Sequence, residues 1–557
     1  AVSDANDSTK DPNEGDWIDT MQGLLVAFVV AMIFRGFVLE GFFIPTGSMA
    51  PTLRGQHVRV RGEATGYAYD ADAGPLFEGG AAATSRAPII DPMVTRQWPV
   101  GETEVGLLRA QSVSGDRVLT IKYLPWVFEP HRWDVPVFRN PPDPVGESMN
   151  YIKRLVGMPN EGLVLADGDV FTGPLGAPGD AMRIQRKPEM VQRAVWQPVW
   201  RSDWSPVDVK RMEQALRKPW PGPALKPATA ERSRWKTDDA HAWTCSGDGE
   251  TRLEFDLRAW PLTDWNAYNA WRRVPEFPIS DVRMRGAFEA ASALKFSAVV
   301  ELVTRELRIE AGVRPASGGL EAFATVQPVD GGAAMASKAQ SLGTAGGAGS
   351  VLALDVWHVD QKIWVFVGGA LQIELPYELD TDGTSPMERL QSVGIEPGRY
   401  AQDPVSTKPK APESLAWKFV GSPLVARDLR VDRDLYYQPG ILLHGNQVVS
   451  NGPIVMGRAF ACDPEHPAQL GPDDFLLLGD NSPASRDGRF WGRPHPILKN
   501  AIGFEKPFVV PREMLVGAAW CVYFPATYPL GTGLDMRDPA ARAPGIVPNF
   551  GSLRFIR

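Results

Sequence analysis

A serine near the start of the chain lies in a context that could make it reactive. Ser48 lies in the stretch FFIPTGSMAPTL, from Phe42 to Leu53, between a glycine and a methionine and bracketed by two prolines. A serine hydroxyl is a weak nucleophile unless a neighbouring base, a histidine or a neutral lysine, accepts its proton. The stretch therefore presents a candidate nucleophile, and its chemistry depends on which residue is the base.

A lysine in an apolar segment is the better candidate for this base. Lys153 lies within NYIKRLVGMP, residues 150–159, where burial would desolvate the ammonium group and lower its pKa. The serine stretch lacks the G-x-S-x-G pattern, and the histidines show no recurring spacing with Asp or Glu and no HExxH motif. A histidine base stays open, with His57 the nearest in sequence, but the pattern favours Lys153.

An apolar run, MQGLLVAFVVAMIFRGFVL from Met21 to Leu39, precedes the serine. As a helix it would span roughly 28 Å, close to the thickness of a bilayer's hydrocarbon core. The segment before it is acidic and no small-residue cleavage site follows it, which disfavours a cleaved signal peptide. We expect an N-terminal tail over residues 1–16 and a membrane anchor over 17–40, with a buried core helix as the alternative. The basic residues on its two sides do not indicate its orientation.

Composition restricts the partners and the cofactors. The chain has 557 residues and a net charge of -8, and no basic stripe or tail appears, so we expect no nucleic-acid partner. Cys245, Cys462 and Cys521 lie far apart in the sequence, which leaves no CxxC metal spacing and at most one disulfide. We expect neither a metal nor another cofactor.

Strand patterns dominate after the apolar run, so the fold class is mainly β. Asp167-Gly168 and Gly368-Gly369 each separate two short apolar runs, as in hairpins. Residues 280–313 alternate polar and apolar side chains over strand-length segments. We expect a helix from near Val207, and a flexible loop over the small and polar residues 331–350.

Several sequence blocks, taken in order, resemble those of the bacterial type I signal peptidases, which are membrane-anchored Ser-Lys endopeptidases. The serine block is IPTGSMAPTL and the lysine block is YIKRLVGMP. Between them lie GDRVLTIKYL and RWDVPVF, and after them come FLLLGDNSPASRDGRFWG and VPREMLVGAAWCVYFP. The resemblance implies a β catalytic domain behind one transmembrane helix.

The resemblance also implies roles for individual residues. Ser48 would be the nucleophile and Lys153 the general base, with the Ser48 N–H and the Thr46 hydroxyl binding the oxyanion. Ser485 would orient the lysine. The site would be braced by Asp480, Asp487 and Arg489. The substrate pockets would be lined by Phe42, Ile44, Met49, Leu53 and Ile152. The block FLLLGDNSPASRDGRFWG departs from the family at Ser482, Pro483, Ala484 and Gly488, which puts the bracing in doubt rather than the catalysis.

The family's partners and location follow from the same resemblance. We expect signal peptides of preproteins as substrates, and the lipid bilayer of the cytoplasmic (inner) membrane as a partner. The catalytic domain would lie on the outer, periplasmic face and comprise residues 41–194 and 436–557, with a small insertion at 62–112.

A large insertion, residues 195–435, separates the two catalytic segments. Its repeated short strands and Gly turns favour a β-sandwich, which we interpret as a lectin-like jelly roll. Trp357 and Trp364 could bind a sugar if exposed, although tryptophans in strands are more often core residues; the ligand is unknown. We expect the two ends of the insertion to lie close together, and its body either to be independent or to pack over the catalytic sheet.

Two other functions fit parts of the sequence. One is a membrane-tethered binding protein that uses the β-sandwich and keeps a degenerate peptidase scaffold. The other is a soluble Ser-Lys self-cleaving protease of the repressor type, which would have no anchor.

Overall fold

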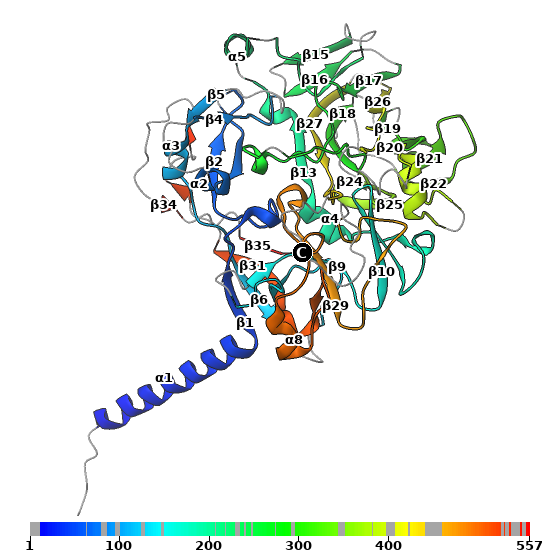
Figure 1. Cartoon of the computed structure of the whole chain (residues 1–557). Coiled ribbons are helices and arrows are strands. Elements are labelled where there is room, and N and C mark those ends of the chain that lie inside the picture. The colour runs from blue at the N-terminus through cyan, green and yellow to red at the C-terminus, as the bar shows by residue number, and fades with distance from the viewer. Residues whose placement is uncertain are drawn as a thin grey trace, which may run out of the picture.

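The arrangement of the chain is seen in a computed structural model (Figure 1). The structure describes residues 12–556 except 63, 79–85, 95–100, 124–128, 146–149, 207, 218, 229–233, 239–240, 247–248, 273, 291–295, 344–350, 381–382, 397–406, 422–423, 441–458, 525–527, 530–533, 536–545 and 548–552. Most of the expected tail, residues 1–11, and the end of the expected loop, 344–350, therefore lie outside the described residues.

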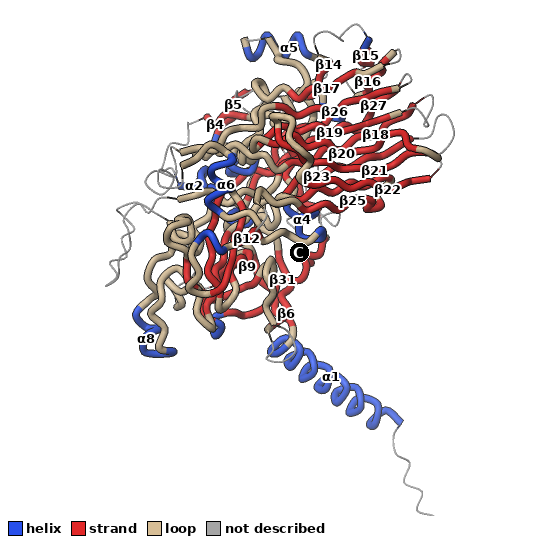
Figure 2. Tube along the Cα trace, turned by 90° about the vertical axis from the view of Figure 1, so that its right-hand side faces the viewer, coloured by secondary structure: helices blue, strands red, loops and turns tan. Residues whose placement is uncertain are grey.

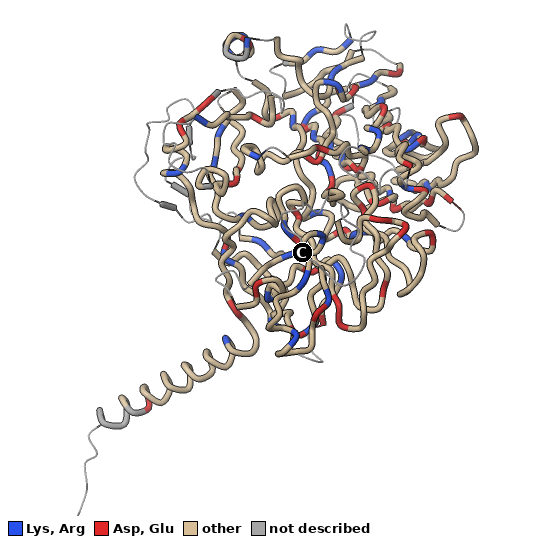
Figure 3. The backbone as a smooth tube through the Cα atoms, viewed as in Figure 1, with Lys and Arg blue, Asp and Glu red and all other residues tan. Residues whose placement is uncertain are grey.

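The N-terminal helix α1, Pro12–Phe37, extends away from the rest of the molecule (Figures 1 and 2). Its segment Asp19–Phe37 is long and apolar enough to cross a membrane, and none of it is buried. Within this segment the charged residues are Asp19 and Arg35, near its two ends, and the helix between them is coloured as uncharged in Figure 3. The alternative of a buried core helix is therefore wrong, because large side chains such as Leu25 and Phe28 are exposed along its length.

A six-stranded sheet follows the helix directly and forms the centre of the part that the sequence predicts to be catalytic (residues 41–194 and 436–557), called the catalytic part below. Its strands lie in the order β1-β6-β31-β7-β8, with the short β35 beside β31. Their bounds are β1 Leu39–Phe43, β6 Arg117–Lys122, β7 Pro136–Arg139, β8 Asn150–Ile152, β31 Leu515–Phe524 and β35 Arg554–Phe555. Strands β1 and β8 are thus the two outer members of this order.

Smaller sheets and short helices complete this part. The sheets are β30-β29-β9 (Val510–Pro511, Asp474–Leu478, Arg154–Gly157), β12-β11-β10-β28 (Arg183–Ile184, Asp169–Pro174, Glu161–Ala166, Ala468–Gln469), β3-β2-β33 (Ala68–Asp72, His57–Arg61, Leu534–Asp535), β4-β5 (Arg86–Ile89, Gly101–Glu104) and β32-β34 (Tyr528–Pro529, Ile546–Val547). The helices are α2 Gly74–Glu78, α3 Val105–Ala110, α4 Glu189–Val195, α8 Pro496–Ile502 and the 3-10 turns η1 Gly47–Met49, η2 Gly179–Ala181, η8 Ser482–Ala484 and η9 Arg512–Met514.

The insertion forms a β-sandwich of two antiparallel sheets, whose strands run across Figure 2 one below another. One sheet has the order β15-β16-β27-β18-β23-β24-β25 with β13 beside β27: Trp235–Asp238, Ala242–Cys245, Leu424–Arg433, Val282–Ala290, Val351–Val359, Lys362–Val367, Ala370–Pro376 and Gln197–Arg201. The other is β14-β17-β26-β19-β20-β21-β22: Leu225–Pro227, Thr251–Phe255, Ser414–Val420, Ser297–Thr304, Leu307–Ala316, Gly319–Pro328 and Ala336–Gly343. Helices α5 Val209–Leu216 and α6 Pro386–Ser392 and the turns η3 Ser202–Trp204 and η5 Ala267–Asn269 lie in its connections. The mainly β fold class and the sandwich are confirmed.

Local predictions from turn chemistry and patterning hold in most places. Asp167 and Gly168 have positive φ values of 47° and 85° and join β10 to β11, and Gly368-Gly369 joins β24 to β25. The expected helix near Val207 is α5. The expected flexible loop at 331–350 is wrong in its middle, because strand β22 pairs there with β21. This strand is the outer member of its sheet and its side chains are largely exposed, so it accepts small polar residues without an apolar stripe.

The two tryptophans considered for sugar binding belong to the interior of the insertion. Trp357 and Trp364 are 0% and 3% exposed and pack with Trp196 and Phe366. The core interpretation of these two residues is therefore correct, and the interpretation as an exposed sugar platform is wrong. The three cysteines are free.

The sandwich packs closely against the catalytic part. Its ends lie side by side, as the sequence predicts, because Gln197 is opposite Arg433 in the pairing of β13 with β27. Side chains at and after α6, among them Leu390, share a core with the hairpin β10-β11. Arg389 also donates hydrogen bonds to Asp167 and Asp169 of that hairpin at 2.8 and 2.5 Å. The insertion thus packs against the catalytic part rather than projecting from a loop tip.

Candidate active site

The serine and the lysine meet in space although 105 positions separate them in the sequence. Ser48 lies in the 3-10 turn η1 directly after β1, and Lys153 lies between β8 and β9. Nζ of Lys153 is 2.5 Å from Oγ of Ser48 and 3.2 Å from the carbonyl oxygen of Ile152. The lysine can therefore exchange a proton with the serine directly.

Burial makes the lysine a usable base. Its side chain is 3% exposed, and burial lowers its pKa from 10.5 to about 8. The carboxylates of Asp487 and Asp480 raise this pKa in part, and the Arg489 guanidinium lowers it. At neutral pH a pKa of about 8 leaves roughly a tenth of the amine neutral, against well under a thousandth at the ordinary value.

A buried ion pair fixes the backbone next to the lysine. Arg154, the residue after the base, donates to both carboxylate oxygens of Asp480 at 2.8 and 2.6 Å. Thr52 lies just beyond η1, which we call the serine turn, and donates to the same carboxylate at 2.5 Å. Asp480 thus links the serine block to the lysine block, and its ionic partner is Arg154, which the sequence interpretation missed.

The second ion pair lies within the block that follows. Arg489 donates to Asp487 at 2.8 and 2.7 Å, and Asp487 accepts the backbone N–H of Gly479 at 2.9 Å. Arg489 also donates to the hydroxyl of Ser482, a position where the sequence departs from the family, at 2.8 Å. The side chain at this position is therefore one of the partners of the arginine.

A groove of about 720 Å³ opens over Ser48 and Lys153. Both outer strands of the six-stranded sheet contribute to its wall, β1 through Phe42 and Phe43 and β8 through residues 150–152. Of the five residues expected in substrate pockets, Phe42, Ile44 and Ile152 line the groove. The structure places the other two, Met49 and Leu53, in the core beneath it, both 0% exposed.

The two expected hydroxyl partners lie close to the site. Thr46 lines the groove with an exposed side chain one residue before η1. Ser485 is buried and its Oγ has no hydrogen-bond partner among the described residues. A Cβ added at Gly479 would lie 2.2 Å from this Oγ and 2.5 Å from the Ser48 carbonyl oxygen, so Gly479 is needed where the two serines approach.

Residues that no sequence pattern indicated also contact the serine turn. Asn481 donates from its backbone N–H to the Ser48 carbonyl at 3.1 Å and from its side chain to the Gly47 carbonyl at 2.9 Å. From the insertion, Asn269 exchanges hydrogen bonds with Asn481, and Arg272 lines the groove. Asn481 could have been suspected from its place in the GDN sequence, but nothing near Asn269 suggests such a contact.

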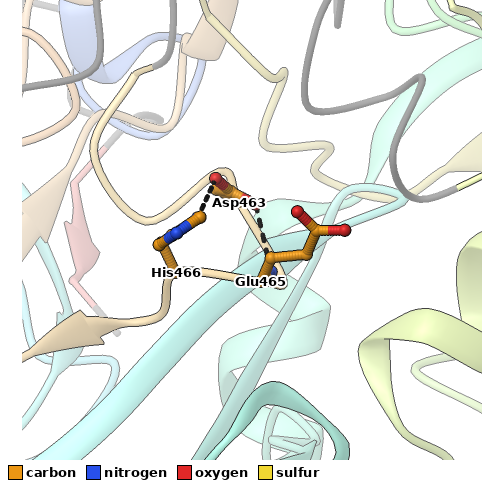
Figure 4. A group of neighbouring side chains, drawn as sticks. All are labelled: Asp463, Glu465 and His466. Atoms are coloured by element: carbon orange, nitrogen blue, oxygen red, sulfur yellow. Dashed lines mark hydrogen bonds and ion pairs between the residues drawn. The ribbon is translucent and has the colours of Figure 1, made fainter.

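Two groups of described side chains are close enough together to hold a metal ion. In the first, Asp463 is hydrogen-bonded to His466 at 2.8 Å and to the backbone N–H of Glu465 at 3.0 Å, while the Glu465 carboxylate points away (Figure 4). The second is a buried set of four carboxylates, Asp169, Asp281, Asp360 and Asp434. Cationic side chains of Lys187, Arg305 and Arg389 already pair with this set. Neither group lies in the groove lining.

Comparison with solved structures concerns mainly the sandwich. The carbohydrate binding module CBM66 from Bacillus subtilis is matched over 38% of this chain and 95% of that one, at 7% identity and a TM-score of 0.22. The galectin LEC-6 of Caenorhabditis elegans is matched over 28% and 87%, at 14% identity and a TM-score of 0.18. These scores are too low to carry an argument about function. No family model matches the chain.

Comparison with curated proteins concerns the peptidase-like part. A stretch of 137 residues is 31% identical to Signal peptidase I of Pseudomonas aeruginosa, covering 24% of this chain and 30% of that protein. Signal peptidase I of Pseudomonas fluorescens is 32% identical over 137 residues with the same coverage. The chain thus spans less than a third of the length of these curated relatives. It contains a signal peptidase I-like region.

Proposed function

We propose that this protein is a membrane-bound serine endopeptidase that removes signal peptides from exported preproteins. The observation that carries the proposal is the 2.5 Å contact between Ser48 Oγ and the buried Lys153 Nζ at the base of an open groove. A serine and a desolvated lysine in this geometry supply a nucleophile and its base without a histidine. The likeness to Signal peptidase I over 137 residues supports the same assignment.

The reaction follows from the positions of the two side chains. Neutral Lys153 takes the proton of the Ser48 hydroxyl as the oxygen attacks the scissile carbonyl, and the lysine then protonates the leaving amine. The backbone N–H of Ser48 and the hydroxyl of Thr46 stabilise the oxyanion that develops. Water then attacks the acyl-enzyme, with Lys153 again accepting the proton. We assign the orientation of the lysine to Ser485, whose buried hydroxyl has no hydrogen-bond partner among the described residues and is available for this role.

The groove suits an extended peptide. Because β1 and β8 are the outer strands of one sheet and both reach the groove, a substrate strand can hydrogen-bond to both. Phe42, Ile44 and Ile152 present apolar surface to its side chains. Met49 and Leu53 shape these pockets from below, as packing residues of the core under the groove.

The exposed helix α1 supports an anchor in the cytoplasmic membrane. Strand β1 begins two residues after this helix ends, so the nucleophile would be held near the bilayer surface. We place the catalytic part on the outer, periplasmic face, where exported preproteins emerge. Protease digestion of intact spheroplasts tests this placement: the catalytic part should be degraded without lysis of the cells.

The full-length protein in detergent, incubated with a preprotein, tests the activity. Wild-type protein should release the signal peptide, and Ser48→Ala should abolish cleavage while the thermal unfolding temperature stays the same. Ser341→Ala, on the exposed strand β22, is the matched serine control and should cleave normally. Cleavage by Ser48→Ala at the wild-type rate would refute the proposal. Absence of cleavage by the wild-type protein would favour the tethered binding protein instead.

A further inference from the structure

One loop of the β-sandwich extends to the serine turn of the candidate active site. This bridging loop, residues 263–272 and 274–278, leaves and re-enters the sandwich where Thr263 and Pro278 form an antiparallel bridge. At its base, Arg433 of β27 donates to the carbonyl oxygens of Asp264 and Trp265 at 2.8 and 3.0 Å. The loop is therefore held rigidly by the sandwich from which it comes.

The far end of the bridging loop is held by the small insertion. The Trp271 indole donates to the carbonyl of Pro88 at 3.0 Å. Arg272 donates twice to the carboxylate of Asp72, at 3.0 and 2.8 Å. With both ends held, the turn η5 between them has a defined position over the serine turn.

Two side chains of η5 contact the serine turn or its support. The ring of Tyr268 lies directly against Gly47, where an added Cβ would come within 2.3 Å of Cε1 of the tyrosine. Asn269 is 2% exposed, and its side chain both donates to Asn481 at 2.7 Å and accepts from it at 2.9 Å. This reciprocal pair determines which way the amide of Asn481 faces, because a flipped amide would oppose like groups.

The orientation of Asn481 determines the orientation of the oxyanion donor. Its side-chain N–H group holds the carbonyl oxygen of Gly47 at 2.9 Å. That oxygen and the N–H of Ser48 belong to one planar trans peptide unit and point in opposite directions. The hydrogen bond that fixes the Gly47 carbonyl oxygen therefore also fixes the direction of the Ser48 N–H. Oxyanion stabilisation requires such a donor to be aligned before the reaction.

We propose that Asn269 is a positioning residue for catalysis, through which the β-sandwich aligns the Ser48 N–H by way of Asn481. The inference rests on the proposed function, since it assigns a role within that reaction. It also gives the insertion a part in turnover that does not require a ligand of its own.

Steady-state kinetics on the full-length protein test this role. Asn269→Ala should lower kcat about tenfold to a hundredfold, the range expected when a catalytic group is displaced by a fraction of an ångström to 1 Å. KM should change little, because the groove residues are unchanged. The pH at half-maximal activity should also stay near that of the wild type, since Asn269 does not touch Lys153.

Two further variants separate positioning from folding. Asn269→Asp keeps the side-chain size but removes the donor to Asn481, so it should lower kcat in the same way even if the alanine variant is unstable. Trp271→Phe removes a different hydrogen bond of the same loop, while the two Arg272–Asp72 hydrogen bonds still hold that end, so this variant should keep the wild-type kcat.

The outcomes distinguish this inference from the proposed function. Wild-type kcat in a folded Asn269→Asp variant would overturn the inference while leaving the function intact. An equal loss of kcat in Trp271→Phe would also overturn it, because the loop would then act only through its stability. If the wild-type protein itself fails to cleave preproteins, the proposed function fails, and the inference with it.

Discussion

Replacing the buried lysine should stabilise the protein while inactivating it. The pKa of Lys153 falls from 10.5 to about 8 in the folded chain because of burial. At 1.36 kcal/mol per pH unit, this difference means that the protonated lysine destabilises the native state by about 3 kcal/mol. Lys153→Met keeps an apolar stem of similar length and loses the two hydrogen bonds that Nζ makes, to Ser48 and to the Ile152 carbonyl, which contribute about 1 kcal/mol each. The variant should therefore gain roughly 1 kcal/mol near pH 6.5.

The pH dependence of the gain carries the test. Below pH 8 the lysine is protonated in both states and the full destabilisation is present. Between pH 8 and 10.5 the unfolded chain binds more protons than the native one, so wild-type stability rises with pH and the advantage of the variant shrinks. Thermal unfolding of both proteins at pH 6.5 and pH 10 measures this difference.

A second buried lysine provides the matched control. Lys187 Nζ lies 2.5 Å from Asp360 and 2.9 Å from Asp434, and these carboxylates raise its pKa well above the usual value despite burial. Lys187→Met should therefore destabilise the protein by about 3–5 kcal/mol, because it leaves buried carboxylates unpaired. The reasoning would be refuted if Lys153→Met melted below the wild type at pH 6.5, or if its advantage did not change with pH.

Three other outcomes follow from the site. Activity of the wild type should rise with pH through a single ionisation near pH 8, and Lys153→Arg should be inactive because a guanidinium stays protonated; appreciable cleavage by this variant would rule out a lysine base. Thr46→Val should lower kcat by about 10²-fold to 10³-fold with little change in KM, whereas Thr46→Ser should keep a kcat near that of the wild type. If the valine and serine variants cleave a preprotein at the same rate, the Thr46 hydroxyl does not bind the oxyanion. Arg154→Leu leaves Asp480 as an unpaired buried carboxylate and should cost about 3–5 kcal/mol, while Arg154→Leu combined with Asp480→Leu should recover part of this; a double-mutant cycle from thermal unfolding measures the coupling.

Local sequence was sufficient to predict structure wherever a short segment determines its own conformation or its own preference for water or lipid. The run from Met21 to Leu39 contains too few polar groups to prefer water, and the Asp167-Gly168 turn needs positive φ values that these two residue types adopt readily. Ser48 and Lys153 could be selected as the candidate nucleophile and base because such groups each require a recognisable setting. The same reasoning failed at strand β22, where pairing with β21 orders a segment whose own residues favour a loop.

Contacts between distant segments were decided only by the tertiary structure. The size of the Lys153 pKa change depends on how completely the surrounding strands exclude water, and the partner of Asp480 depends on where β9 and β29 pair. Met49 and Leu53 resemble pocket residues in the sequence, yet packing places them under the groove floor. The approach of Asn269 to Asn481, 212 positions apart, left no local signal because a hydrogen bond between two amides constrains neither segment's own pattern. Burial and proximity are properties of the whole packed chain, and for this reason the sequence determined which residues could react and the fold determined how they are held.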